Sequence, residues 1–157
     1  MDNDIHYQFA VPSDTSHLAN LRRVITEVLD NASFAPLKAN LIALAVDEAV
    51  ANIMEHGQSC GSGHTEPQSG DILVLVDLSA ERLAITIRDK SAGFDPRGVP
   101  EVDLAEHLKA GRRRGLGVYL IRRIMDEVNY TTRENSENEL QLVKYVDESL
   151  ETARSNR

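Results

Sequence analysis

The stretch AVDEAVANIMEHG, residues 45–57, decides the fold. It forms the second half of a region in which apolar residues recur at three- and four-residue steps. This spacing predicts a helix over residues 36–56, opened by Pro36 and ended by Gly57. The apolar stripe of this expected helix consists of Leu37, Leu41, Leu44 and Ala45.

Two polar side chains, followed by a histidine, continue the same stripe. Glu48 and Asn52 are one helical turn apart, so their side chains point the same way, about 6 Å apart along the axis. A carboxylate on an apolar face needs a partner, because burying an unpaired charge is costly. One interpretation is a cap or an ion pair with an arginine. The other is a site for a hard cation such as Mg²⁺, which prefers oxygen ligands. His56 is the next residue of the stripe.

The remaining pattern predicts a two-layer α/β sandwich with a mixed, mostly antiparallel sheet and helices on one face. We expect one domain over residues 1–157, because the length suits one core and no repeat or linker is visible. Residues 58–70 form an expected surface loop, and residues 89–115 an irregular lid. The expected strands are 6–11, 72–78, 83–88, 129–133 and 140–146, and the other expected helices are 14–31, 103–110 and 116–127.

Composition narrows the class of partner. The formal net charge of −8 disfavours nucleic acid and anionic membrane surfaces, so we expect protein or small-molecule partners. The sequence contains no apolar run long enough for a membrane span and no signal-peptide pattern at its start, so we expect a cytoplasmic protein. His56, Cys60 and His64 are evenly spaced, but they lack a fourth zinc ligand, and we disfavour a metal site there.

A short motif, DKSAGF at residues 89–94, follows the expected strand over residues 83–88. Taken alone it is a turn. Its functional interpretation is that Asp89 accepts a hydrogen bond from an amino group, as on adenine. Gly93 would then let a planar ligand approach the backbone.

A glycine-rich basic segment, GRRRGLG at residues 111–117, precedes the last expected helix. Backbone N–H groups at a helix start attract anions, so a phosphate-bearing ligand is expected here. The alternative is a solvated basic face that balances nearby acidic residues. No Walker A sequence is present. The candidate phosphate-side residues are Arg113, Gly115, Leu116 and Gly117.

The order of these three motifs resembles the N, G1 and G2 boxes of the Bergerat-fold ATPases, the GHKL superfamily. Within that superfamily, residues 45–57 and 114–121 are most similar to the anti-sigma-factor serine kinases of the RsbW type. The likeness extends over nearly the whole chain.

The resemblance implies a role for each matching residue. Glu48 matches the catalytic carboxylate, Asn52 the Mg²⁺ ligand and Asp89 the adenine-binding residue. Gly93 matches the second glycine of G1, and the lid residues at 113 and 115–117 lie on the phosphate side. We expect Glu48 to be ionised with an ordinary pKa of about 4.3.

Two functions follow as expectations. The first is an ATP- and Mg²⁺-dependent serine kinase that sequesters a sigma factor and phosphorylates an anti-anti-sigma (STAS) antagonist, commonly as a homodimer. The second is a binding module that uses ATP without transferring phosphate and so leaves Glu48 idle. The ATP-binding half of a histidine kinase is a third interpretation, disfavoured because no room remains for a phospho-acceptor helix pair.

The chain departs from the family pattern in two places. Ser91 stands where the first glycine of the Asp-x-Gly-x-Gly box is usual. Asn138-Glu139-Leu140 stands where Gly-Thr-Thr is common, so we expect a hydroxyl contact near adenine to be missing. Thr131 and Thr132 are the candidates to replace it.

Overall fold

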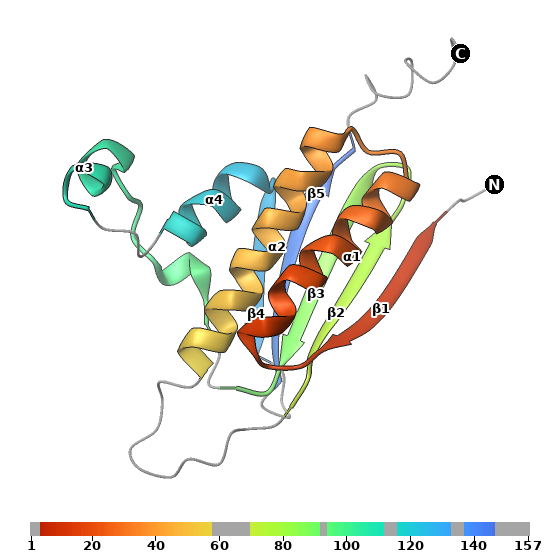
Figure 1. Ribbon diagram of the computed structural model, residues 1–157, viewed down its shortest axis with the longest axis horizontal. Coiled ribbons are helices and arrows are strands. Elements are labelled where there is room, and N and C mark those ends of the chain that lie inside the picture. Colours follow the sequence, from red (N-terminus) through yellow and green to blue (C-terminus); the bar gives the residue numbers. More distant parts are fainter. Residues whose placement is uncertain (1–3, 58–69, 92–93, 112–115, 133–136, 147–157) are drawn as a thin grey trace.

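The computed structural model describes residues 4–57, 70–91, 94–111, 116–132 and 137–146. These residues form a five-stranded sheet with helices on one face (Figure 1). The strand order is β1-β2-β3-β5-β4, and every described ladder is antiparallel. The expected two-layer α/β sandwich is confirmed, but the sheet was expected to be mixed, mostly antiparallel, and its described ladders are antiparallel throughout. The strands are β1 (Ile5–Val11), β2 (Ile72–Leu78), β3 (Arg82–Asp89), β4 (Glu127–Thr132) and β5 (Asn138–Tyr145), and the α-helices are α1 (Leu18–Asn31), α2 (Pro36–Gly57), α3 (Leu104–Lys109) and α4 (Leu116–Ile124).

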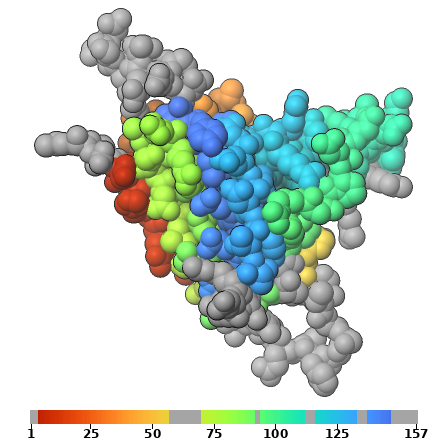
Figure 2. Space-filling model, turned by 180° about the vertical axis from the view of Figure 1, so that it is seen from behind, coloured from red at the N-terminus to blue at the C-terminus, as the bar shows by residue number. Residues whose placement is uncertain are grey.

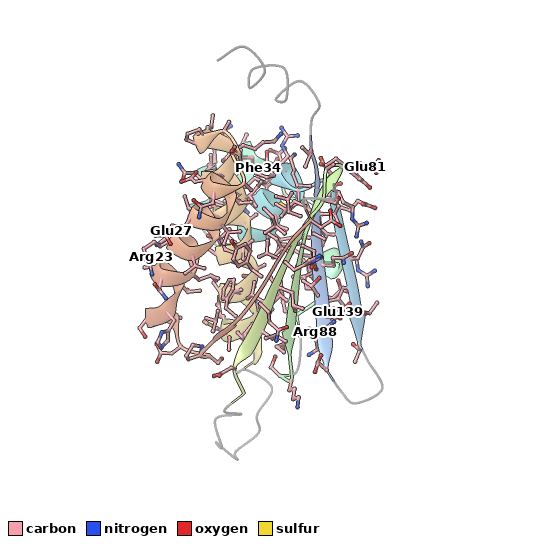
Figure 3. All side chains as sticks on the ribbon, turned by 90° about the vertical axis from the view of Figure 1, so that its right-hand side faces the viewer. Arg23, Glu27, Phe34, Glu81, Arg88 and Glu139 are labelled. Atoms are coloured by element: carbon pink, nitrogen blue, oxygen red, sulfur yellow. The ribbon has the colours of Figure 1, made fainter. Side chains whose placement is uncertain are left out.

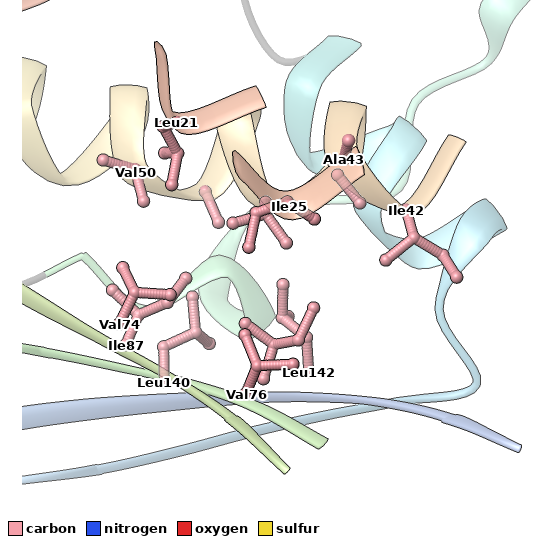
Figure 4. Packing of buried hydrophobic residues seen from close by; sticks show 14 of the residues in the cluster. Leu21, Ile25, Ile42, Ala43, Val50, Val74, Val76, Ile87, Leu140 and Leu142 are labelled. Carbon is pink, nitrogen blue, oxygen red and sulfur yellow. The ribbon is translucent and has the colours of Figure 1, made fainter. Parts of the chain in front are cut away.

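Alternation along the strands builds the core between the sheet and the helices. In β2 the buried and half-buried positions alternate strictly, as expected for a strand with one covered face. Figure 4 shows side chains of β2, β3 and β5 meeting those of α1 and α2. Fully burying one such aliphatic side chain stabilises the fold by about 1.5–3 kcal/mol. The largest fully buried side chains in this layer include Leu21, Ile25, Ile42, Ile85, Ile87 and Leu142.

The outer face of the sheet carries polar side chains. Figure 2 shows this face from behind, with the strands side by side. In Figure 3 Arg88 and Glu139 lie on the side of the sheet away from the helices. Arg88 Nε is 2.9 Å from a carboxylate oxygen of Glu139 and 3.7 Å from one of Glu137. The charged pairs are partly exposed, so they contribute little to stability.

The start of the first helical region agrees with the sequence pattern. Asp14 has extended backbone angles, and its carboxylate accepts a hydrogen bond from Ser16 N at 2.8 Å. It therefore caps a short 3₁₀ turn, Thr15–His17, which leads directly into α1. The helical region therefore begins at the predicted place, while the α-helix itself starts at Leu18, later than the expected residue 14.

The buried face of α2 agrees only in part with the predicted stripe, because Ala45 is buried and Leu44 is half-buried. Leu37 and Leu41 are 73% and 40% exposed. Apolar residues surround much of α2, so periodicity alone did not define which face would be buried. Packing between α1, α4 and the sheet selects a neighbouring stripe. The buried apolar residues of α2 are Ala39, Ile42, Ala43, Ala45, Val46, Ala49, Val50, Ile53 and Met54.

Helix α4 ends, and β4 begins, earlier than expected. The helix was predicted to reach residue 127, yet it ends at Ile124. Asp126 explains the early turn, because its backbone N–H donates to Val143 O at 2.8 Å and its carboxylate accepts from Tyr145 N at 2.8 Å. These bonds fix the chain to β5 before another helical turn can form. Among the described residues, no helix is both long and apolar enough to cross a lipid bilayer.

Candidate functional site

Glu48 lies where α2 meets the first turn of α4. The Glu48 side chain is half-buried, and Gly117 is the second residue of α4. An added Cβ at Gly117 would fall well inside van der Waals contact with Glu48 Oε2 and 3.4 Å from Glu48 Cδ. The start of α4 therefore approaches the carboxylate as closely as it does because residue 117 has no side chain. Leu116 opens the same helix.

The electrostatic surroundings change the ionisation of Glu48. Burial raises its pKa above the ordinary value, the adjacent charge of Asp47 raises it further, and the Arg22 guanidinium opposes both effects. The expectation of an ordinary pKa was therefore wrong, because α4 covers a carboxylate that is exposed in an isolated helix. A carboxyl group with a raised pKa is a better proton acceptor once it is ionised.

The sequence left open an ion pair between Glu48 and an unspecified arginine, and in the described residues an arginine lies next to Asp47 instead. Arg22 Nε, on α1, is 3.5 Å from Asp47 Oδ1. That oxygen is buried and has no hydrogen-bond partner among the described residues. Burial raises the pKa of Asp47 and Arg22 lowers it. At this distance the ion pair is only loosely formed, so the adjacent carboxylates Asp47 and Glu48 are incompletely neutralised.

Asn52 lies one turn beyond Glu48 with an unused polar atom. Its Nδ2 is buried and has no hydrogen-bond partner within the described part of the chain. A buried amide without a partner is costly, and such groups call for a ligand or water. No three described His, Cys, Asp or Glu side chains gather in a metal-binding arrangement. The unpartnered Nδ2 is a hydrogen-bond donor and fits an acceptor such as a phosphate oxygen, whereas the carbonyl oxygen Oδ1 of the same amide is the atom of a type that Mg²⁺ accepts.

Asp89 lies at the end of β3, on the face of the sheet that the helices cover. It is directly opposite Asn138 on β5, which is directly opposite Thr132 on β4. Asp89 and Asn138 are 6% and 4% exposed. Asp89 Oδ1 accepts hydrogen bonds from Asn138 Nδ2 at 3.3 Å, from Ser91 N at 2.9 Å and from the Ser91 hydroxyl. Ser91 and Asn138, the two places where the chain departs from the family pattern, thus both donate hydrogen bonds to Asp89 Oδ1.

The last turn of α2 connects to the segment that follows Asp89. The rings of His56 and Phe94 stack with centroids 4.4 Å apart and planes 13° from parallel. From Glu48 to His56 the helix advances eight residues, about 12 Å. Glu48 and Asn52 thus lie on the same helix as His56, whose ring stacks on Phe94, five residues beyond Asp89 in the chain. His56 takes part in this stack, and the other two residues of the disfavoured zinc site, Cys60 and His64, lie outside the described residues.

The basic segment at residues 111–117 lies only partly within the described residues, which include its Leu116 and Gly117. Gly93, Arg113 and Gly115 lie outside the described residues. Arg122, farther along α4, contacts the expected lid segment over residues 89–115. Its Nη2 donates hydrogen bonds to Pro96 O at 2.7 Å and to Val99 O at 2.8 Å. This arginine serves the fold of the segment rather than an open anion site, which sequence spacing did not distinguish.

The sequence analysis did not assign Arg22, Asn138 and the His56–Phe94 stack to the site. Each depends on contacts between elements far apart in the chain. The only available signal was that Asn138 replaces a residue type common in the family.

Comparison with known proteins identifies the family to which this fold belongs. Residues 11–144 match the family model described as the histidine kinase-like ATPase domain. The chain therefore belongs to the histidine kinase-like ATPase family, whose domain implies ATP binding.

Several relatives among curated proteins carry the name serine-protein kinase RsbW, and they confirm the RsbW-type resemblance. One from Bacillus cereus and one from Bacillus thuringiensis subsp. konkukian are each 26% identical over 125 residues, covering 77% of this chain and 74% of the relative. Among solved structures, a chain of the SiaB–SiaC complex from Pseudomonas aeruginosa superposes with a TM-score of 0.57 at 17% identity, covering 89% of both chains. This second likeness concerns the fold.

Proposed function

We propose that this protein is an ATP- and Mg²⁺-dependent protein-serine kinase that acts by partner switching. Residues 1–157 would form its single ATP-binding domain. The observation that carries the proposal is the half-buried pair Glu48 and Asn52 on α2, of which Glu48 lies against Gly117 in the first turn of α4. The name of the RsbW relatives supports the same activity.

Phosphoryl transfer depends mainly on positioning and on neutralising charge. In the proposed reaction, Asp89 holds the adenine amino group, and the N–H groups at the start of α4 face the phosphates. Asn52 would hold Mg²⁺, which would supply positive charge to the phosphate oxygens. The serine oxygen of the partner then bonds to the γ-phosphorus, and the bond from that phosphorus to the bridging oxygen of ADP breaks. Glu48 accepts the hydroxyl proton, for which its environment suits it.

The proposed partners follow from the RsbW-type resemblance. The phosphorylated partner would be a STAS-domain anti-anti-sigma protein, and the sequestered partner a sigma factor. The protein would act as a homodimer in the cytoplasm, where a sigma factor works. The acidic net charge of −8 accords with protein partners rather than nucleic acid.

The test compares phosphate transfer by two matched variants. Purified protein is incubated with γ-labelled ATP, Mg²⁺ and each STAS-domain protein of the same organism. Glu48→Gln should lower labelling of the STAS protein by about 10²–10⁴-fold while ATP binding is retained. Glu55→Gln, an exposed change on the same helix, is the control and should label normally.

The same experiment separates the proposal from the alternative. A wild-type protein that binds ATP but labels none of the STAS proteins would favour the non-catalytic binding module. Normal labelling by Glu48→Gln would remove the catalytic role of this carboxylate.

A further inference from the structure

A row of three polar side chains crosses the sheet at the end of β3, where the neighbouring rows are apolar. Asp89 pairs with Asn138, and Asn138 pairs with Thr132. The adjacent row on the same face contains Ile87 opposite Leu140, both buried. Of these three residues, Asp89 and Asn138 are buried and Thr132 is exposed. Buried polar groups beside a hydrophobic core are retained only where each has a partner or a task.

The hydrogen bonds of Asn138 give its amide one orientation. Asn138 Nδ2 donates to Ser91 O at 2.8 Å and to Asp89 Oδ1 at 3.3 Å. Its Oδ1 accepts from the Thr132 hydroxyl at 3.4 Å. An amide rotated by 180° would place an acceptor against the Asp89 carboxylate and the Ser91 carbonyl and lose both of these contacts, whereas the Thr132 hydroxyl can pair with either end of the amide. The donor side of Asn138 therefore faces Asp89.

The Asp89 carboxylate is held in place through hydrogen bonds to one of its two oxygens, Oδ1. The described hydrogen bonds to the Asp89 side chain, from Asn138 and from both donors of Ser91, all end on Oδ1. A carboxylate oxygen accepts about two hydrogen bonds at its lone pairs, so Oδ1 is saturated. The remaining oxygen, Oδ2, is the one left to accept a donor from a ligand.

From this geometry we propose that Asn138 is a positioning residue that sets base specificity. It fixes the Asp89 carboxylate so that Oδ2 presents an acceptor to an exocyclic amino group, and it thereby makes the site select 6-aminopurine nucleotides over 6-oxopurine nucleotides. The inference rests on the proposed function, because it assumes that Asp89 meets the base. Ser91 assists through its hydroxyl.

Selectivity distinguishes this role from a merely structural one. The amino group of ATP is a donor, whereas the 6-oxo group of inosine triphosphate (ITP) is an acceptor and is repelled by a fixed carboxylate. A site built around a hydrogen bond rejects a ligand that lacks the matching group far more strongly than a loose apolar pocket does. Loss of structure would weaken both nucleotides together, while loss of positioning would change the ratio of their dissociation constants.

The experiment measures Kd for ATP and for ITP in the full chain by calorimetry. Asn138→Ala should lower the ratio Kd(ITP)/Kd(ATP) at least about tenfold, the value of one well-placed hydrogen bond. Asn129→Ala, an exposed asparagine on β4, is the matched control and should keep the wild-type ratio. Ser91→Ala removes one of the donors and should lower the ratio by a smaller factor.

Each outcome of the ATP and ITP measurements supports or overturns the positioning role of Asn138. An unchanged ratio in Asn138→Ala would overturn the inference and leave the proposed function intact. If Asn138→Ala does not fold, Ser91→Ala, a partly exposed change, decides by the same ratio. A wild-type protein that binds ATP and ITP equally would overturn the inference, and one that binds neither would overturn the proposed function as well.

Discussion

Replacing Gly117 with alanine tests whether the start of α4 positions Glu48. The new Cβ would lie 3.4 Å from Glu48 Cδ and 3.6 Å from Glu48 Cβ, and closer still to Oε2. To reach the roughly 3.5 Å of a relaxed contact, the carboxylate oxygen has to withdraw by about 1 Å. The side chain of Glu48 is flexible and half-buried, so it can make this movement without unfolding the protein.

The effect on stability and the effect on catalysis should therefore separate. Alanine is favoured over glycine in a helix by about 0.5–1 kcal/mol, which offsets the cost of moving one side chain. We expect a melting temperature within about 3 °C of wild type. A displacement of about 1 Å at a reacting group costs on the order of 10²-fold in rate, so kcat for labelling of the STAS protein should fall by that factor.

The assay pairs kcat with the Kd for ATP. Binding should change only a few-fold, because the backbone N–H groups of α4 are unaltered. Gly98→Ala is the control, since a Cβ there meets nothing within 4 Å. Wild-type kcat in Gly117→Ala would refute the reasoning, and a parallel loss of ATP binding would assign Gly117 to the nucleotide rather than to Glu48.

Three further predictions concern charge, the base and the core. Asp47 raises the pKa of Glu48 and Arg22 lowers it. Asp47→Asn should therefore move the acidic limb of the kcat–pH profile to lower pH, and Arg22→Gln should move it to higher pH. An acidic limb at the same pH in both variants would contradict this assignment. Asp89→Asn should abolish measurable ATP binding in calorimetry and leave the circular dichroism spectrum unchanged, and normal affinity would refute the adenine role. Leu142→Ala should lower the free energy of unfolding by about 2–5 kcal/mol in urea titrations, because the side chain is fully buried; a loss below about 1 kcal/mol would show that the core has collapsed around the cavity.

Local patterns predicted the elements of this fold well. Period-two alternation identified β2 and β3, and Pro36 marks the first residue of α2 as expected. These features depend on residues close together in the chain. The choice of buried face on α2 does not, because α1, α4 and the sheet make that choice together.

The candidate site was predictable in its residues but not in its environment. The spacing of Glu48 and Asn52 sufficed to place both on one side of α2. The raised pKa of Glu48 depends on burial by α4, and the contacts of Asn138 with Asp89 and Ser91 link residues 49 and 47 positions apart. Such through-space effects have no counterpart in a local pattern.

The two hydrogen bonds from Arg122 to the carbonyls of Pro96 and Val99 couple α4 to the segment that leads toward α3. In Figure 1 α3 lies at the far edge of the molecule, away from the sheet, and its Leu104 and Leu108 are 37% and 61% exposed. A rigid shift of α4 on meeting a γ-phosphate would therefore pull on this distant apolar tip. The position of α3 at the protein surface, well away from the reacting atoms, would then differ between the triphosphate-bound and the diphosphate-bound protein.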